Sequence, residues 1–94
     1  MLAKFAIALL ETSSIAKGVE ASDAMCKMAQ VELVQTRNIA RGKYTILISG
    51  PVGEVESSLR AGAAMAGKTV IHQFIVRNVH QQVLDALGKR RPVE

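Results

Sequence analysis

The sequence predicts one domain of the α/β (α+β) class, in which two helices cover one face of a four-stranded antiparallel sheet. Three observations support this fold. The chain has 94 residues, 49% of them apolar and 21% charged, as in a single folded domain. Short apolar runs alternate with segments of helical periodicity. Glycine, proline and serine separate these segments from one another.

The beginning of the chain predicts a strand and a helix. The short apolar run from Lys4 to Leu10 predicts a buried strand. A serine in the turn that follows is suited to cap a helix. The expected inner face of this helix carries Ile15, Val19, Ser22, Cys26 and Ala29. On that face Cys26 is expected to be a small buried hydrophobe and not a nucleophile.

The middle of the chain predicts a hairpin. A second strand begins at Val31–Val34, and the β-branched segment Tyr44–Ser49 predicts a third strand. The tip of the hairpin is expected around Ala40, Arg41 and Gly42.

The second half predicts a helix and a last strand. Gly50 and Pro51 end the third strand and begin the helix, which Gly67 ends. The inner face of this helix is expected to carry Val55, Leu59, Gly62 and Ala66. The segment Thr69–Val76 predicts the fourth strand.

A short last helix is expected from Val79, Val83 and Leu87, ending at Gly88. Residues 1–88 would thus form the domain and residues 89–94 a basic tail. The order of the first six elements, β-α-β-β-α-β, is that of the ferredoxin-like fold. Since this fold supports many functions, it does not determine the activity.

No arrangement of residues typical of catalysis is present. His72 and His80 have no acidic or thiol side chain at metal-ligand spacing, and the acids Glu54 and Glu56 are expected to be exposed. Nucleophile elbows and glycine-rich phosphate loops are absent from the sequence. We therefore expect no enzyme activity, no metal and no cofactor.

Charge and cysteine content limit the cellular setting. The net charge of +4 is compatible with anionic metabolites or nucleic acid but requires neither. The single cysteine forms no internal disulfide, which favours the cytosol. The apolar run from Leu2 to Leu10 is too short to span a bilayer, so no membrane partner is expected.

The hairpin segment from Arg37 to Tyr44 leaves three readings open. It is a plain solvated tip, an RNA-binding surface, or the lining of an oligomer axis. An RNA-recognition sheet needs aromatic residues on which bases can stack. In this sequence Lys43 and Leu47 occupy two of the positions where such a sheet has aromatic residues. Nucleic acid is therefore not expected as a partner. A ferredoxin-like module that binds RNA or a small regulatory ligand is the alternative function, and tight, salt-dependent RNA binding would support it.

Five short motifs resemble those of bacterial microcompartment shell proteins with a BMC domain. In chain order they are Ala8-Leu9-Leu10-Glu11-Thr12, Glu20-Ala21-Ser22-Asp23-Ala24-Met25-Cys26-Lys27, Gly50-Pro51-Val52-Gly53-Glu54-Val55, Ala61-Gly62-Ala63-Ala64, and Val76-Arg77 with His80. The motifs keep the order found in that family and cover the chain from about Ala3 to Leu87.

The resemblance implies a structural role. Members of the family form cyclic hexamers that tile into sheets around enzymes inside the bacterial cytoplasm. Expected partners are therefore copies of the same chain, related shell proteins and the enclosed enzymes. The pore residues implied by the resemblance are Ile39, Ala40, Arg41 and Gly42. The implied residues of the edge between hexamers are Lys27, Arg77, Asn78 and His80.

Three departures from the family pattern concern these sites. Arg41 replaces a small residue, and a ring of arginines would favour small anionic metabolites at the pore. Ala40 replaces a glycine that lets the tip adopt unusual backbone dihedrals. The edge loop reads Val76-Arg77-Asn78-Val79-His80, one residue longer than the usual motif, and is expected to sit differently.

Overall fold

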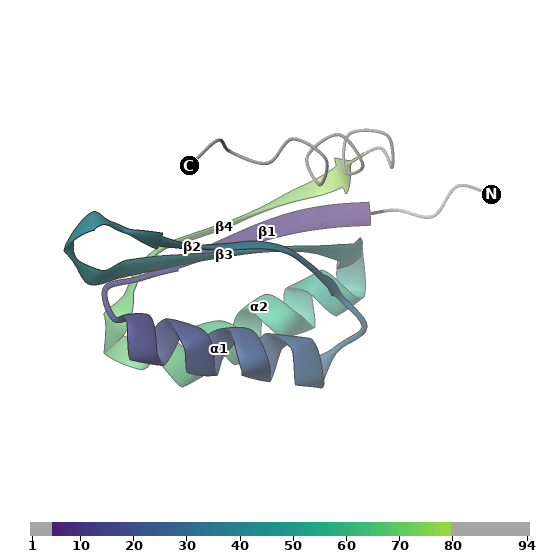
Figure 1. Ribbon diagram of the computed structural model, residues 1–94. Helices are drawn as coiled ribbons and strands as arrows, with labels where there is room; N and C mark the ends of the chain where they lie inside the picture. The colour runs from purple at the N-terminus through teal and green to yellow at the C-terminus, as the bar shows by residue number, and fades with distance from the viewer. Residues whose placement is uncertain (1–4, 80–94) are drawn as a thin grey trace.

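The computed structural model describes residues 5–79, which form a four-stranded sheet with two helices on one face (Figure 1). The elements are β1 (Phe5–Thr12), α1 (Ile15–Met28), β2 (Glu32–Ile39), η1 (Ala40–Gly42), β3 (Lys43–Pro51), α2 (Val52–Ala66), η2 (Gly67–Thr69) and β4 (Val70–Val79). The sheet order is β2-β3-β1-β4, with every neighbouring pair antiparallel. This arrangement confirms the predicted fold class.

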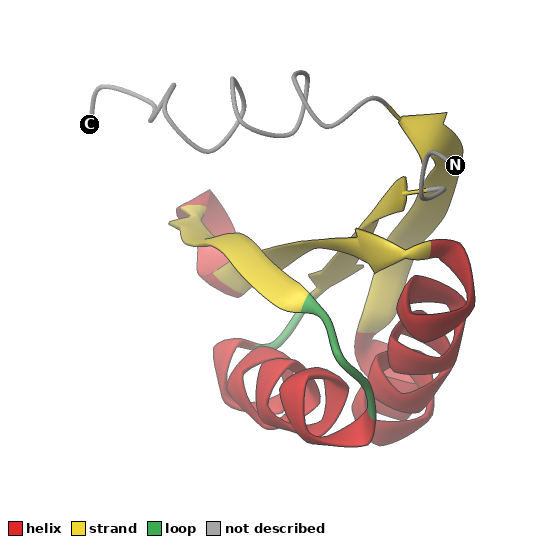
Figure 2. Ribbon diagram, turned by 90° about the vertical axis from the view of Figure 1, so that its right-hand side faces the viewer, coloured by secondary structure: helices red, strands yellow, loops and turns green. Residues whose placement is uncertain are grey.

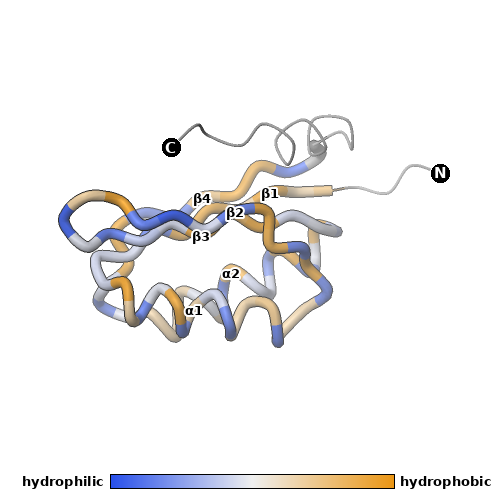
Figure 3. Tube along the Cα trace, in the orientation of Figure 1, coloured by the Kyte–Doolittle hydropathy of each residue, from blue (hydrophilic) through white to orange (hydrophobic). Residues whose placement is uncertain are grey.

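The two helices form a single layer that leaves the other face of the sheet uncovered by described elements (Figure 2). In β1, buried and half-buried residues alternate strictly, although the strand is hydrophobic along most of its length (Figure 3). Successive side chains of a strand point to opposite faces. The run predicted as a buried strand is therefore buried only on its helix side.

Helix α1 begins where the sequence predicts a cap. The side chain of Ser14 accepts a 3.1 Å hydrogen bond from the backbone N–H of Lys17, in the first turn. The hydroxyl of Thr12 donates to the carbonyl of Ser14 at 2.7 Å, which ties the end of β1 to the start of the helix.

The predicted inner face of α1 is wrong by one residue. The buried residues are Gly18, Ala21 and Met25, whereas Cys26 is exposed and Val19 is 50% exposed. One residue of an α-helix turns by about 100°, which moves the whole apolar stripe to the outside. The reason is close packing: a side chain on Gly18 would overlap the ring of Tyr44 in the sheet.

Helix α2 follows the prediction closely. Its buried residues are Val55, Ser58, Gly62 and Ala66, and Leu59 packs half-buried against the core. Pro51 precedes the helix as its N-cap. Gly67 follows the last helical residue with a φ of 56°, a left-handed conformation that suits glycine.

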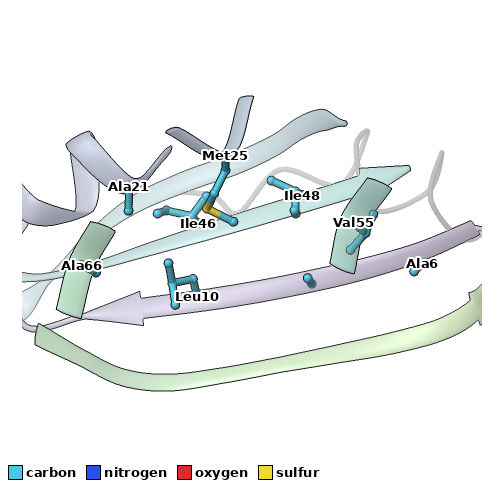
Figure 4. Close-up of a cluster of buried hydrophobic side chains, with 9 residues drawn as sticks. Ala6, Leu10, Ala21, Met25, Ile46, Ile48, Val55 and Ala66 are labelled. Carbon is cyan, nitrogen blue, oxygen red and sulfur yellow. The ribbon is translucent and has the colours of Figure 1, made fainter. Parts of the chain in front are cut away.

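The core lies between the sheet and the helices (Figure 4). The largest apolar side chains buried there are Leu10, Met25, Ile46, Ile48 and Val55. One polar contact crosses this layer: the hydroxyl of Ser58 donates to the carbonyl of Met25 at 2.9 Å and joins the two helices.

The end of β4 differs from the prediction. Val79 pairs with Phe5 as the last residue of the strand, so it does not begin a helix. The rest of the expected last helix and the predicted tail, residues 80–94, lie outside the described residues. The domain boundary at residue 88 therefore stays a prediction.

Candidate functional site

The hairpin tip forms as predicted, as a short 3-10 turn between β2 and β3. Ile39 ends β2 and pairs with Lys43, and Ala40, Arg41 and Gly42 make the turn. Arg41 has φ 71° and ψ 28°, a left-handed conformation that non-glycine residues adopt at a cost. Ala40 does not have a positive φ. The unusual dihedral expected at position 40 thus falls on Arg41 and on Gly42, whose φ is 77°.

The tip carries a concentration of positive charge. Arg37, Arg41 and Lys43 lie within this hairpin, and Arg37 and Arg41 are exposed. None of the three forms an ion pair with an acidic side chain of residues 5–79. The tip is therefore available to attract anions.

Tyr44 does not provide a stacking surface beside this tip. Its ring lies against Gly18 of α1, on the helix side of the sheet. An RNA-recognition sheet presents its aromatics on the opposite, open face. The geometry therefore gives no support to RNA stacking at the start of β3.

Lys27 lies in the last turn of α1, with 77% of its side chain exposed. Its ammonium group lies 3.1 Å from the carboxylate of Asp23, one turn earlier on the same helix. Exposed ion pairs of this kind contribute little to stability, so Asp23 leaves the ammonium group of Lys27 largely free to bind another group.

Arg77 lies within β4 and not in a loop after the strand, as the resemblance implied. It pairs with Ala6, whose side chain is buried, and therefore points to the helix side of the sheet. Its Nε and Nη2 atoms each lie 2.9 Å from Oε2 of Glu56 in α2. The arginine that the resemblance assigns to the edge between hexamers is thus anchored within its own subunit.

The other two edge residues are less fully described. Asn78 follows Arg77 in β4, and His80 lies outside the described residues.

Sequence reasoning missed the contacts of the two acids of α2. Oε1 of Glu54 accepts a 2.8 Å hydrogen bond from the backbone N–H of Gln30, just after α1. Glu56 holds Arg77, and both acids are half-buried. The sequence predicts both acids to be exposed helix residues. The partners lie 24 and 21 residues away and are brought close only by the fold.

The β2–β3 hairpin tip lies at the opposite end of the subunit from the end of α1 (Figure 1). The tip joins β2 and β3 at one end of the sheet, where Tyr44 pairs with Thr12. The end of α1 lies at the other end, since Gln30 contacts Glu54 in the first turn of α2. Arg77 is there too, in register with Ala6 and Gly50. The strand between these ends spans roughly 20 Å or more.

Residues 5–79 hold neither a metal cluster nor a membrane span. No three His, Cys, Asp or Glu side chains in this part of the chain are placed to bind a metal ion together. Neither α1 nor α2 is long and apolar enough to cross a bilayer.

Comparison with known proteins identifies relatives along most of the chain. The chain is 38% identical over 89 residues to the bacterial microcompartment shell protein PduT of Citrobacter freundii. It is 34% identical over 87 residues to the major carboxysome shell protein CsoS1A of Halothiobacillus neapolitanus, covering 89% of each protein. A crystal structure of a microcompartment protein from Desulfitobacterium hafniense matches with a TM-score of 0.86 and 47% identity.

The lengths of these relatives differ. The chain spans 48% of the PduT protein and 50% of the D. hafniense protein, while 95% and 96% of the chain itself is matched. The BMC domain profile matches residues 6–79, nearly the whole described region. Two of these relatives are shell proteins, one of a bacterial microcompartment and one of a carboxysome. The chain therefore belongs to the BMC domain family.

Proposed function

We propose that this chain is a structural subunit of a bacterial microcompartment shell and forms cyclic hexamers that tile into sheets. The hairpin tip faces the ring axis, and the end that carries Lys27 and Arg77 faces the neighbouring ring. The observation that carries this proposal is the separation of the tip from these two residues along the strands. A subunit with its pore group and its edge group at opposite ends can supply both contacts at once.

In this arrangement the tip lines a cationic pore. A cyclic hexamer brings one Arg41 from every subunit to the axis, flanked by Ile39, Ala40 and Gly42. Rings of like charge favour counter-ions and repel ions of the same sign. The pore therefore passes or holds small anionic metabolites, and anions at the axis relieve repulsion among the guanidinium groups.

The role of the chain is transport and enclosure without catalysis of its own. Its partners are other copies of the chain, related shell proteins and the enzymes inside the shell. The chain acts in the cytoplasm, as part of the shell. Its similarity to a microcompartment shell protein and a carboxysome shell protein supports this role.

Solution mass tests the ring directly. Size exclusion with light scattering should give six times the subunit mass of 10.1 kDa. A stable monomer or dimer at all protein concentrations would rule out the ring as proposed.

Anion binding tests the pore. Sulfate should bind at the ring axis with a stoichiometry of one per ring, and Arg41→Ala should abolish this one-per-ring binding while leaving the solution mass unchanged. Arg37→Ala is the matched control, because it removes the same charge from the exposed part of β2. An Arg41→Ala variant that does not assemble, or that binds sulfate like the parent protein, contradicts the assignment of Arg41 to the pore.

A further inference from the structure

A second group of basic side chains lies far from the hairpin tip, in a cleft between α2 and β4. We call it the α2–β4 cleft, and its volume is about 340 Å³. Its lining residues are Glu56, Leu59, Arg60, Gln73, Ile75 and Arg77.

The periodicity of both elements builds this cleft. Gln73, Ile75 and Arg77 alternate along β4, so they share the face that is turned to the helices. Glu56 and Arg60 lie one turn apart on α2 and therefore face the same side. The lining thus comes from two rigid elements and not from a loop.

The charge of the cleft is unbalanced. It contains two guanidinium groups and one carboxylate, and that carboxylate already binds Arg77 through Oε2. Arg60 forms no ion pair with any acid of residues 5–79. The side chains therefore leave one positive charge without a counter-ion within the described structure.

The hydrogen-bonding groups also select for an anion. A guanidinium carries five N–H donors, and Arg77 donates a hydrogen bond to Glu56 through Nε alone, while its Nη2 lies 2.9 Å from the same oxygen. Arg60 and the amide of Gln73 add further donors at the same cleft. Arginine pairs well with the two oxygens of a carboxylate or phosphate, because their geometry matches its planar fork.

The remaining lining residues and the cleft volume determine the size of the ligand and the polarity of its carbon skeleton. Leu59 and Ile75 are half-buried and supply an apolar floor between the charged groups. A cleft of this volume lies at the small end of the range for ligand sites, about 300–1,000 Å³. It therefore suits a short carbon chain that ends in an oxyanion.

We propose that the α2–β4 cleft binds a small organic anion, a phosphate ester or carboxylate, between Arg60 and Arg77. Glu56 acts as a positioning residue that fixes the guanidinium of Arg77. This site is separate from the pore: it binds one anion per chain, whereas a site on the ring axis binds one per ring. The inference stands whether or not the pore proposal is correct, but it requires that the neighbouring ring leaves the guanidinium of Arg77 open to the cleft.

Calorimetric titration of the full chain at fixed ionic strength tests this site. The probes are inorganic phosphate, glycerol 3-phosphate and succinate. We expect saturable binding with a stoichiometry of one per chain. Glycerol 3-phosphate should bind more tightly than inorganic phosphate if the apolar floor contributes, and equal affinity would restrict the ligand to the oxyanion alone.

Two substitutions identify the cleft as the site. Arg60→Gln should weaken binding at least tenfold, because it removes one of the two guanidiniums that hold the anion. Gln73→Glu should weaken binding as much, because it places a second carboxylate in the cleft. Both side chains are exposed, so both variants should keep the parent's thermal unfolding transition.

The controls separate this site from general surface charge and from the pore. Lys68→Gln makes the same charge change on exposed η2 and should leave binding unchanged. Arg41→Gln should leave the one-per-chain binding intact. The proposal fails if no probe binds saturably, if Lys68→Gln weakens binding as much as Arg60→Gln, or if Arg41→Gln abolishes all binding.

Discussion

The ring of Tyr44 in β3 lies directly against the Cα of Gly18 in α1. A Cβ added at position 18 would overlap several atoms of the tyrosine, including its Cβ and ring carbons. The glycine therefore lets the first helix approach the sheet close to the hairpin tip. It explains why α1 turns Gly18 toward the sheet and leaves Val19 half exposed.

Gly18→Ala should destabilise the fold. The clash involves atoms close to the tyrosine backbone, which have little freedom to move. We expect a loss of about 1–3 kcal/mol in the free energy of unfolding, as overpacked cores show. Chemical denaturation at fixed protein concentration measures it. A double-mutant cycle with Tyr44→Ala should recover part of the loss, because removing the ring leaves room for the added methyl group.

Two other helical glycines provide controls for this effect. Gly53, in the first turn of α2, has open space around it, so Gly53→Ala should stabilise the protein by about 0.5–1 kcal/mol. Gly62→Ala would mainly meet the flexible side chain of Met25 and should cost less than Gly18→Ala. If all three substitutions cost the same, helix propensity and not the contact with Tyr44 determines the effect.

The hydrogen bond between Ser58 and Met25 gives a second prediction. Ser58 is fully buried, and its hydroxyl donates to the Met25 carbonyl at 2.9 Å. Ser58→Ala removes the donor and should cost about 1–3 kcal/mol of unfolding free energy. Ser57→Ala, one residue earlier on the same helix and without a side-chain hydrogen bond among residues 5–79, should change it by less than about 0.5 kcal/mol. Equal effects of the two changes would contradict the role given to this bond.

The left-handed backbone conformation of Arg41 leads to a prediction that does not depend on its charge. Arg41→Ala keeps a Cβ in the left-handed region, whereas Arg41→Gly removes it. The glycine variant should therefore be the more stable of the two, by about 0.5–1 kcal/mol after allowing for the flexibility of glycine in the unfolded chain. Both variants lose the same charge, so thermal or chemical unfolding isolates the backbone effect. An alanine variant at least as stable as the glycine variant would show that position 41 is not strained.

The sequence predicts the strands and the order of the elements well, because alternation, turn residues and caps act locally. The sequence also predicts the orientation of α2, because there the hydrophobic residue Val55 is also a buried residue. It fails for α1, where Ile15 and Val19 are more hydrophobic than Gly18 and Ala21 yet lie outside. A hydrophobic pattern indicates which side chains favour the interior. It does not indicate how much room the interior leaves for each side chain. The need for a glycine opposite Tyr44 depends on the distance between helix and sheet.

Prediction of the candidate site from the sequence is limited in the same way, to features that local residues determine. The hairpin tip could be predicted because Gly42 marks the turn within the sequence itself. The anchoring of Arg77 by Glu56 could not, because it joins the end of β4 to the first turns of α2. The position of Arg77 within the strand depends equally on a long-range feature, its pairing with β1.

The end of α1 provides the last prediction, which concerns contacts between rings. Lys27→Ala should leave the solution mass of the ring unchanged and abolish extended sheets under electron microscopy, because it removes an exposed ammonium from the proposed edge. Asp23→Ala is the matched control: it breaks the same 3.1 Å ion pair but leaves Lys27 in place. Both variants should lose less than about 0.5 kcal/mol of stability, as expected for an exposed pair on a helix. Sheets formed by Asp23→Ala but not by Lys27→Ala would support a contact made by the lysine itself. If both variants form sheets, the assignment of Lys27 to the edge is wrong. If neither variant forms sheets, the ion pair between Asp23 and Lys27 is what the edge contact requires, and not the ammonium group alone.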